Sequence, residues 1–290
     1  MIAILGARGF VGQAVLQQAV RAGLDARPVA RTEVDYTRAS ELTGFLRDVR
    51  PQFLINAAGY TGRPNVDACE LHKAECLAGN GVLPGVIREV CEDLQIPWGH
   101  VSSGCIFTGS KPDGSGFTEE DPPNFSFRQD NCSFYSGCKA LGEEVLQGAE
   151  RCYIWRLRIP FNHIDGPRNY LSKLMRYDTL LQATNSLSHL DEFAAACVAC
   201  ITGEVEYGTY NLTNPGAVTT SEVVDLIRKH GLTDKAFRFF DSEDQFMQLA
   251  AKTPRSNCVL DSSKAIRAGL PLSSVHDALE KALREWQPER

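Results

Sequence analysis

The sequence predicts an α/β fold in which a doubly wound parallel sheet of the Rossmann type carries a smaller C-terminal lobe. Short apolar segments alternate with amphipathic segments through the first half of the chain, the order expected of a parallel sheet covered by helices on both faces. A glycine-rich turn joins the first apolar segment to the first amphipathic one. After Pro160 the alternation becomes irregular, which predicts a separate, smaller unit.

The expected strands are short and apolar, and segments with helical spacing of apolar residues separate them. The strands are expected over residues 2–5, 27–30, 53–56, 97–102 and 152–158. The helices between them are expected over residues 10–22, 39–49, 66–78, 81–94 and 133–148. Pro51 ends the second helix, because proline cannot continue one. A long surface loop rich in Gly, Pro, Asp and Asn, of the kind that borders a site, is expected over residues 109–131.

The C-terminal part is expected to begin near Pro160. Residues 1–160 are then the sheet domain, and residues 161–290 form a smaller lobe, some segments of which pack back on that domain. Short helices are expected over residues 170–176, 192–202, 221–230, 242–251 and 275–286.

Composition and charge exclude several classes of protein. The 290 residues are 43% hydrophobic and 23% charged, as in folded soluble proteins. The 36 acidic residues exceed the 30 basic ones, for a net charge of −6, which argues against nucleic-acid or membrane-surface binding. No apolar stretch approaches the roughly 18 residues of a membrane helix, and the N-terminus lacks a secretion signal. We therefore expect a cytoplasmic protein.

The ten cysteines are too sparse in a chain of this length for a disulfide scaffold. Cys197 and Cys200 form one C-x-x-C pair, which lies inside an apolar helical run with no second ligand pair nearby. A buried helix face explains this pair better than zinc or redox chemistry does. We expect reduced cysteines and no bound metal.

The glycine turn reads Gly6-Ala7-Arg8-Gly9-Phe10-Val11-Gly12 and opens the first helix. Glycines permit a tight turn and a close approach of the backbone, and the free N–H groups of a helix N-terminus bind a pyrophosphate. The turn therefore predicts a dinucleotide site. Its G-x-x-G-x-x-G spacing differs from the commonest fingerprint, so a plain strand–helix turn remains an alternative.

The second strand ends beside Arg31, where a binder of NAD usually has an acidic residue. Arg31 and Arg8 suit a ribose 2′-phosphate, because guanidinium groups grip phosphate through forked, charged hydrogen bonds. The sequence thus favours NADP over NAD, with Asp35 beside the adenine amine. The alternative is that both arginines are solvated surface residues.

Tyr135 and Lys139 lie four residues apart on a predicted helix, a spacing that puts both on one face. A nearby ammonium lowers the pKa of a phenol from about 10 and makes it a usable proton donor and acceptor. The run Asn56-Ala57-Ala58-Gly59 ends the third strand, beside the expected cofactor. Ser103 ends the fourth strand, where its hydroxyl can polarise a carbonyl. The alternative is a surface pair without chemistry.

Five further sequence segments narrow the choice of protein family. They read Gly62-Arg63-Pro64-Asn65-Val66-Asp67-Ala68-Cys69-Glu70, Ser103-Gly104-Cys105-Ile106-Phe107, Ser133-Phe134-Tyr135-Ser136, Pro167-Arg168-Asn169-Tyr170-Leu171-Ser172-Lys173 and Pro254-Arg255-Ser256-Asn257. With them, the whole chain resembles the extended short-chain dehydrogenase/reductase superfamily. Within it, the chain is similar to the nucleotide-rhamnose synthase/epimerase-reductase proteins, relatives of dTDP-4-dehydrorhamnose reductase. The resemblance implies NADPH-dependent conversion of an NDP-4-keto-6-deoxyglucose into NDP-L-rhamnose.

The resemblance implies roles for five residues. Ser103, Tyr135 and Lys139 match the family's reducing group, and Cys105 and Lys173 match its epimerising pair. The family's R-N-F-x-x-K stretch has a tyrosine here in place of phenylalanine. The fourth strand lacks the S-T-D-Y pattern of reductase-only relatives, which favours the bifunctional group. Which member of the epimerising pair is the base stays open, and a buried thiol and a solvated ammonium remain the alternatives for these two.

The substrate is expected to meet phosphate-binding and sugar-binding side chains. Arg63 and Arg255 are candidates for phosphate, and Asn65, Asp67 and Asn169 for sugar or pyrophosphate oxygens. The reacting groups Ser103, Cys105 and Lys173 would border the sugar as well. An alternative for Asp67 and Glu70 is that they cap and charge the helix that starts there.

Two other functions stay open. One is a 4-keto reductase without epimerase activity, of the dTDP-4-dehydrorhamnose reductase or GDP-fucose-synthase type. The other is a non-catalytic NADP-binding regulatory subunit, the role similar folds play for methionine adenosyltransferase. Expected partners are a 4,6-dehydratase of the same pathway and a second copy of the chain, paired through the helices at residues 81–94 and 133–148. The nucleobase stays open.

Overall fold

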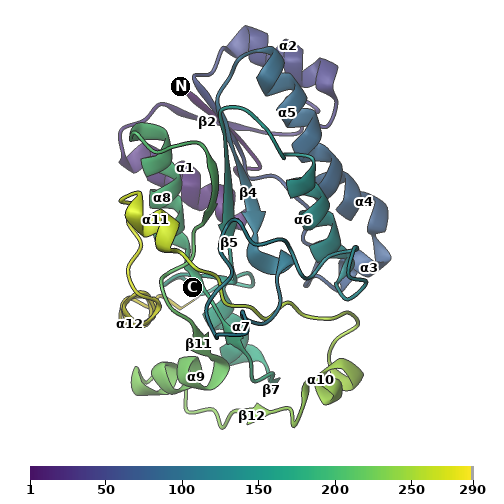
Figure 1. The fold of residues 1–290 in the computed structure, drawn as a ribbon. Coiled ribbons are helices and arrows are strands. Elements are labelled where there is room, and N and C mark those ends of the chain that lie inside the picture. Colours follow the sequence, from purple (N-terminus) through teal and green to yellow (C-terminus); the bar gives the residue numbers. More distant parts are fainter. Residues whose placement is uncertain (289–290) are drawn as a thin grey trace.

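The computed structural model describes residues 1–288, and its core is a six-stranded sheet. The strands are β1 (Ile2–Leu5), β2 (Ala26–Val29), β3 (Phe53–Asn56), β4 (Trp98–Ser103), β5 (Cys152–Leu157) and β10 (Gly208–Asn211). Their order is β10-β5-β4-β3-β1-β2, and every neighbouring pair is parallel. The predicted doubly wound parallel sheet is therefore confirmed (Figure 1).

Burial explains why these segments form strands. Every residue of β1, β3 and β5 is buried, as expected where helices cover both faces of a sheet. The edge strand β2 is more exposed and contains Pro28, which an edge tolerates because its N–H side needs no partner. In the centre, Trp155 of β5 lies flat against Gly99 of β4, where a Cβ atom would come within 2.1 Å of the indole ring.

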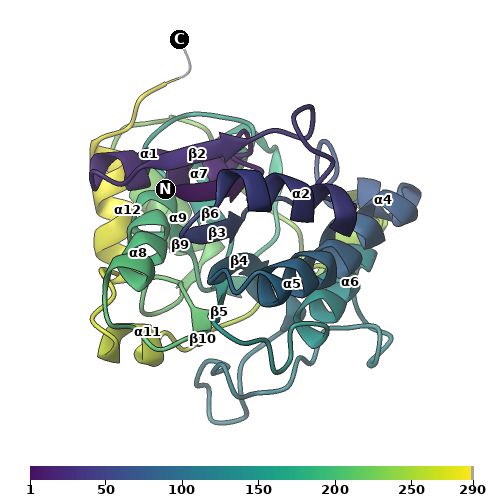
Figure 2. The same cartoon turned by 90° about the horizontal axis from the view of Figure 1, so that it is seen from above.

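Helices cover the sheet on both faces, as Figures 1 and 2 show. On one face pack α1 (Phe10–Arg21) and α8 (Leu190–Thr202). On the other lie α2 (Ala39–Val49), α5 (Leu83–Asp93) and α6 (Phe134–Glu144). The two apolar clusters between sheet and helices are the main core, and α6 packs through two smaller clusters that contain Ala140 and Cys138.

The chain between β3 and β4 differs from the two predicted helices. It forms α3 (Ala68–Leu71), α4 (Lys73–Leu77), a π-helical turn over Ala78–Val82 and then α5. His72, with φ −120°, interrupts the first helix. The π turn lies at Asn80, whose side chain donates to Tyr60 O at 2.7 Å and accepts from Tyr60 N at 3.2 Å. Asn80 thus satisfies both backbone groups of Tyr60 from a break between helices.

The second half of the chain forms short elements around a third apolar cluster. Its helices are α7 (Tyr170–Arg176), α9 (Thr220–Lys229), α10 (Glu243–Leu249), α11 (Ser263–Arg267) and α12 (Val275–Arg284). Its two-residue strands are β6 (Pro160–Phe161), β7 (Thr179–Leu180), β8 (Thr184–Asn185), β9 (Ser188–His189), β11 (Val218–Thr219) and β12 (Arg238–Phe239). These strands pair as β6-β9, β7-β12 and β8-β11. The expected helices are present, whereas α11 and the strand pairs are additions.

Three elements of the second half, α8, β10 and α11, lie on or in the large sheet. A division of the chain near residue 160 stays a prediction. Residues 257–260 also return to the first half, where isolated bridges join Gly109 to Cys258 and Phe117 to Leu260.

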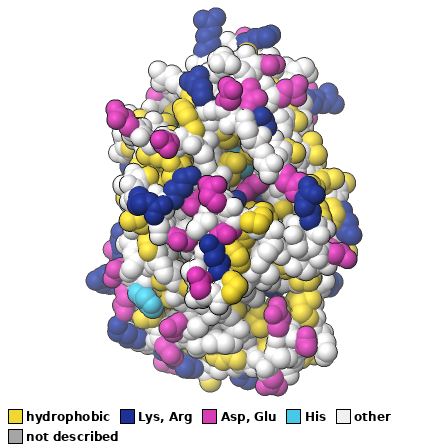
Figure 3. Space-filling model, viewed as in Figure 1, with side chains coloured by type: hydrophobic (Ala, Val, Ile, Leu, Met, Phe, Trp, Pro, Cys, Tyr) yellow, Lys and Arg dark blue, Asp and Glu magenta, His cyan; other side chains and the backbone are white. Residues whose placement is uncertain are grey.

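The surface carries mixed charge. Lys and Arg side chains alternate with Asp and Glu over the face in Figure 3, without a broad field of one sign. Within residues 1–288, no helix combines the length and the apolar character that a membrane crossing requires.

Candidate active site

The glycine turn between β1 and α1 is tightly packed. Gly6 has φ +71°, and a Cβ atom there would come within 2.5 Å of Ala58 N. A Cβ atom on Gly12 would come within 2.2 Å of Gly6 O. Gly9 caps α1 without a side-chain hydrogen bond to the helix, so no side chain covers the first N–H groups. The turn therefore fits a pyrophosphate, which binds such free N–H groups.

The two arginines expected at the adenosine end lie near the end of β2 and in the turn. The Arg31 guanidinium lies 3.7 Å from the Asp35 carboxylate and 5.9 Å from the centre of the Tyr36 ring. Hydrogen bonds from Thr37 lower the pKa of Asp35, and the nearby arginines add to this effect. Arg31 is mostly exposed, and Arg8 is exposed in the turn. Both are therefore accessible to solvent.

Three side chains of the predicted reducing group meet at the end of β4. Ser103 ends the strand and accepts a hydrogen bond from Cys105 N at 3.2 Å. The Ser103 side chain also hydrogen-bonds Tyr135, which lies in the first turn of α6. One turn later, the buried Lys139 donates to Val101 O of β4 at 3.4 Å. Its ammonium also lies about 3.7 Å from the position that a Cβ atom on Gly59 would occupy.

Burial decides the protonation of this group. It raises the pKa of Tyr135 well above 10, and the hydrogen bond with Ser103 only partly opposes it. This is opposite to the direction expected from Lys139 alone, because burial and the neighbouring thiols Cys105, Cys69 and Cys76 all raise the pKa. Burial also lowers the pKa of Lys139, against the opposing effect of Cys105 and Glu143. Tyr135 is therefore a protonated phenol at neutral pH.

Asn56 and His100 form a buried pair that sequence reasoning missed. Asn56 Oδ1 accepts from Ala58 N at 3.1 Å, so its Nδ2 donates to His100 Nδ1 at 2.9 Å. Burial keeps the pKa of His100 well below 6.5, which leaves Nδ1 free to accept. The pair fixes the strand end at Ala57-Ala58-Gly59. A histidine three residues before the strand's last hydroxyl gave no signal in the sequence.

Cys105 is buried in the short 3₁₀ turn Gly104–Ile106, next to Ser103. Burial raises the pKa of its thiol, while hydrogen bonds with Ser103 and Ser136 oppose the shift. The cations Arg158 and Lys139 also lower the pKa of this thiol. The structure thus brings Cys105 together with the reducing group. Behind Tyr135, three fully buried cysteines form a cluster: Cys69, Cys76 and Cys138.

Lys173 lies on α7 among other cations. Burial lowers the pKa of Lys173, and Arg168 and Arg255 lower it further. Arg168, which sequence reasoning left out of the site, donates to Gly62 O at 2.8 Å. Arg168 lies just before the N-cap of α7, so helical spacing gave no signal for it. The structure thus brings Lys173 together with Arg168 and Arg255.

Asp67 and Arg255 pair with each other. Two hydrogen bonds of 2.7 and 2.8 Å join the guanidinium to the carboxylate, and Asn65 Oδ1 accepts from Asp67 N at 2.8 Å. Burial raises the pKa of Asp67, but Arg255 outweighs it and the net shift is downward. Asp67 does not cap its own helix. Glu70 accepts from Phe134 N at 2.8 Å, so it caps α6 rather than the helix on which it lies.

The last two predicted substrate residues differ in exposure. Asn169 is fully buried and caps α7, with its Nδ2 donating to Asn162 O at 2.8 Å and to Ile164 O at 2.7 Å. Its amide is therefore committed to the fold. Arg63 is exposed in the loop that also carries Gly62.

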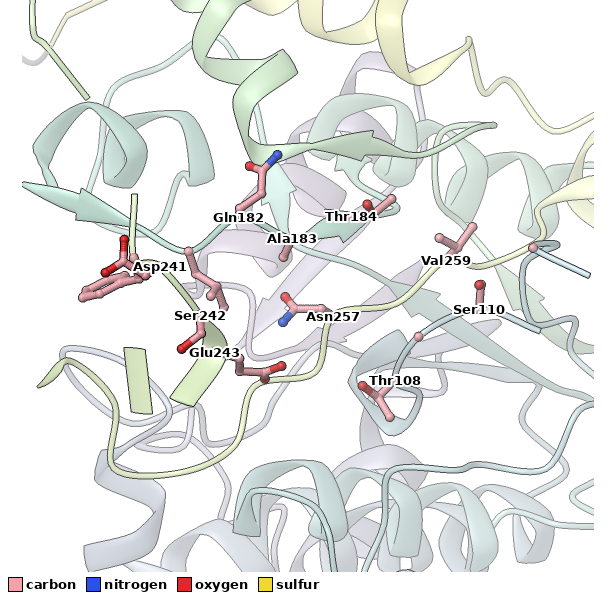
Figure 4. A pocket seen from close by; sticks show the side chains of 14 residues that line it. Thr108, Ser110, Gln182, Ala183, Thr184, Asp241, Ser242, Glu243, Asn257 and Val259 are labelled. Atoms are coloured by element: carbon pink, nitrogen blue, oxygen red, sulfur yellow. The ribbon is translucent and has the colours of Figure 1, made fainter. Parts of the chain in front are cut away.

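A polar cavity of about 530 Å³ lies outside this group of residues (Figure 4). Its lining includes Thr108, Ser110, Gln182, Asn257 and Glu243, and none of the residues predicted from the sequence. A chain of hydrogen bonds connects its wall to the site. Asn185 donates to Asn257 Oδ1 at 3.1 Å and accepts from Arg158, the cation beside Cys105, at 2.7 Å.

Comparisons with known proteins identify the family of the chain. Residues 1–287 match the family described as RmlD substrate binding domain. A bifunctional dTDP-4-dehydrorhamnose 3,5-epimerase/dTDP-4-dehydrorhamnose reductase of Arabidopsis thaliana is 35% identical over 245 residues, which cover 83% of this chain and 79% of the relative.

A second relative from Arabidopsis thaliana is longer. It is a trifunctional UDP-glucose 4,6-dehydratase/UDP-4-keto-6-deoxy-D-glucose 3,5-epimerase/UDP-4-keto-L-rhamnose-reductase, 34% identical over 253 residues. The match covers 86% of this chain, which spans only 37% of that relative.

Solved structures share the fold. The L780 UDP-rhamnose synthase of Acanthamoeba polyphaga mimivirus superimposes with a TM-score of 0.89 at 23% identity, over 98% of each chain. A dTDP-4-dehydrorhamnose reductase from Bacillus anthracis in complex with NADP gives a TM-score of 0.81 at 17% identity, over 98% of this chain and 97% of the other.

Proposed function

The chain belongs to the RmlD substrate binding domain family, and on that premise we propose that it is an NADPH-dependent oxidoreductase of nucleotide sugars. In full, the proposal is a 3,5-epimerase/4-reductase that converts an NDP-4-keto-6-deoxyglucose into NDP-L-rhamnose. The Arabidopsis relatives named for these activities support it. The observation that carries it is the meeting of Ser103, Tyr135 and the buried Lys139 at the end of β4.

The cofactor would lie along the carboxyl ends of β1 and β3, where ligands of parallel sheets bind. The glycines of the turn would hold its pyrophosphate, and Arg8 and Arg31 its 2′-phosphate. Gly59, packed beside Lys139, would let the nicotinamide ribose approach that ammonium. When bound, NADPH supplies the hydride that reduces the ketone at C4 of the sugar.

The protein's own residues then supply the proton that the C4 oxygen takes up. Tyr135 is protonated at neutral pH because burial raises its pKa, so it can donate a proton to the C4 oxygen. Ser103 donates a hydrogen bond to the same oxygen and stabilises the charge that develops there. Lys139 stabilises the phenolate that remains.

Epimerisation needs an acid and a base. The C4 ketone acidifies the protons on C3 and C5, and inversion takes a proton from one face and returns one to the other. Burial and two arginines lower the pKa of Lys173, which makes this amine easier to deprotonate. Burial raises the pKa of Cys105, which favours a protonated thiol. We therefore assign Lys173 as the base and Cys105 as the acid.

The sugar's diphosphate would meet the cations beside α7. Arg168 and Arg255 both act electrostatically on Lys173, and Arg63 lies in the adjoining loop. Guanidinium groups hold phosphate oxygens in pairs. Asn65 and Asp67 would border the same site, and Asn169 would contribute by fixing the start of α7.

The ketone must come from a dehydratase. One Arabidopsis relative is named as a 4,6-dehydratase, an epimerase and a reductase in a single chain. We expect a 4,6-dehydratase, separate or fused, to supply this chain with substrate. Pairing of two copies through α5 and α6 remains part of the proposal.

Product analysis tests the proposal. The purified protein is incubated with NADPH and either UDP- or dTDP-4-keto-6-deoxyglucose, without added epimerase, and the sugar is identified by NMR. NDP-L-rhamnose is the expected product, and Tyr135→Phe should give none while still binding NADPH. An unepimerised 6-deoxy sugar would leave only the reductase. Absence of NADPH oxidation with either substrate, together with copurification of a larger enzyme, would indicate a regulatory subunit.

A further inference from the structure

A buried ion pair lies directly beneath the proposed reducing group. Arg156 of β5 binds Glu143 of α6 through hydrogen bonds of 3.0 Å from Nε and 2.6 Å from Nη2. The Ser102 hydroxyl of β4 donates to the same carboxylate at 2.5 Å. All three side chains are at least nine-tenths buried. The pair therefore clamps α6 against two neighbouring strands.

This clamp, formed by Glu143, Arg156 and Ser102, contacts the elements that hold the residues proposed to react. Glu143 follows Tyr135 and Lys139 at intervals of four residues, so the three share one face of α6. Ser102 immediately precedes Ser103 on β4. Lys139 adds a third tie through Val101 O. The position of Tyr135 relative to Ser103 is thus set by the contacts of Glu143 one and two turns further along the helix.

The clamp also has an electrostatic effect. The groups that act on the Lys139 ammonium are Glu143 and Cys138 of α6, Cys105 of the 3₁₀ turn and Cys76 of α4, together with His100 of β4. Glu143 is the carboxylate in this set. With Cys105, it opposes the lowering of the Lys139 pKa by burial. Arg156 in turn lies 5.2 Å from the centre of the Phe107 ring, beside the turn that carries Cys105.

We propose that Glu143 is a positioning residue for the reduction, which fixes α6 in register on β4 and β5 and supplies the negative charge that keeps Lys139 an ammonium. The proposal rests on the proposed reductase function. It assigns two separate contributions to Glu143, one to the position of α6 and one to the charge near Lys139. Ser102 contributes only to the position of α6.

Glu143→Gln tests the charge, because glutamine keeps the shape and can still accept from Ser102. We expect kcat for reduction of the keto sugar to fall about tenfold or more, with KM changed less than about twofold. We also expect the alkaline limb of the kcat profile to move down by about one pH unit, because Lys139 loses its counter-charge. Ser102→Ala should lower kcat without moving that limb.

Direct titration of Lys139 separates this proposal from the proposed function. The 13Cε shift of Lys139, assigned with Lys139→Met in lysine-labelled protein, gives its pKa without any turnover. A lower pKa in Glu143→Gln supports the proposal even if no substrate is turned over, whereas an unchanged pKa overturns it.

Two further variants serve as controls. Glu144→Gln is the same change one residue later, where the carboxylate pairs with the exposed Arg128 at 2.7 Å, and it should leave kcat and the pH limb unchanged. If Glu143→Gln fails to fold, Glu143→Gln combined with Arg156→Met removes both buried charges, and the titration of Lys139 is repeated there. An equal effect of Glu144→Gln would also overturn the proposal.

Discussion

Burial, more than neighbouring charge, sets the protonation of the residues proposed to react. The phenol of Tyr135, the thiol of Cys105 and the amines of Lys139 and Lys173 all have pKa values shifted by burial toward their neutral forms. A neutral phenol and a neutral thiol are proton donors, and a neutral amine is a base. The free protein thus holds its acids protonated before substrate arrives.

Cys105→Ala separates epimerisation from reduction. We expect conversion of the NDP-4-keto-6-deoxyglucose to fall at least about a hundredfold, the usual size of an acid–base contribution. Reduction of an already epimerised 4-keto sugar should stay within about threefold of wild type. NADPH consumption at 340 nm measures both. Cys258→Ala, which removes a buried thiol that donates to Gly104 O at 3.3 Å, is the matched control. Equal loss on both substrates would show that Cys105 is structural.

Arg8→Ala combined with Arg31→Ala tests the choice of cofactor. Removing both guanidinium groups should erode the preference for NADPH over NADH by more than tenfold, about 1.4 kcal/mol, because the 2′-phosphate loses its partners. The ratio of dissociation constants, from fluorescence titration, gives the answer. Arg27→Ala removes a β2 arginine that lies over Phe45 and should leave the ratio unchanged. A double variant with an unchanged ratio would contradict the assignment.

Residue spacing predicted which side chains could react, but it did not predict the contacts of the proposed substrate-binding residues. The Tyr135 and Lys139 pair follows from helical period, and Ser103 from its place at a strand end. Asp67, Arg255 and Asn169 were predicted to face substrate, yet the structure pairs the first two and buries the third. The sequence contains no sign of these long-range bonds, because their partners are 188 and seven residues away. Their contacts with substrate stay predictions.

At the scale of elements, the long periodic segments were the predictable ones. The helices α1, α2 and α7 begin and end within one residue of expectation, since amphipathic period and proline mark them. The π turn at Asn80 could not be predicted, because it depends on a side chain that reaches Tyr60 in another segment. Two-residue strands such as β8 carry too little sequence to show a pattern.

The packing of β4 on β5 makes Gly99 a sharp test of the sheet. Gly99→Ala would place a Cβ atom 2.1 Å from the Trp155 ring, and overpacking of this kind costs about 1–3 kcal/mol. The urea midpoint should fall accordingly. Gly44→Ala is the control, because no atom lies within 4 Å of its Cβ position in α2. There alanine should raise stability by about 0.5–1 kcal/mol. No loss of stability in Gly99→Ala would contradict the packing.

At the scale of the molecule, the two halves of the chain meet over the proposed substrate site. The loop after β3 is tied to the second half by Asp67 with Arg255 and by Arg168 with Gly62 O. Residues 257–260 run back beside the loop after β4. The fold class and the order of the first strands could be predicted, whereas this closure could not, since it depends on residues far apart in the sequence.

All ten cysteines are free thiols, and nine of them are buried. Cys132, beside the start of α6, is the partly exposed one, and burial still raises its pKa to about 11. A thiol-specific reagent should therefore label the native protein once, slowly and faster as pH rises, and label ten sites after denaturation. Cys132→Ser should show no early labelling, and more than one native site would contradict the burial. The number of modified thiols, counted by mass, therefore measures how much of the chain has unfolded.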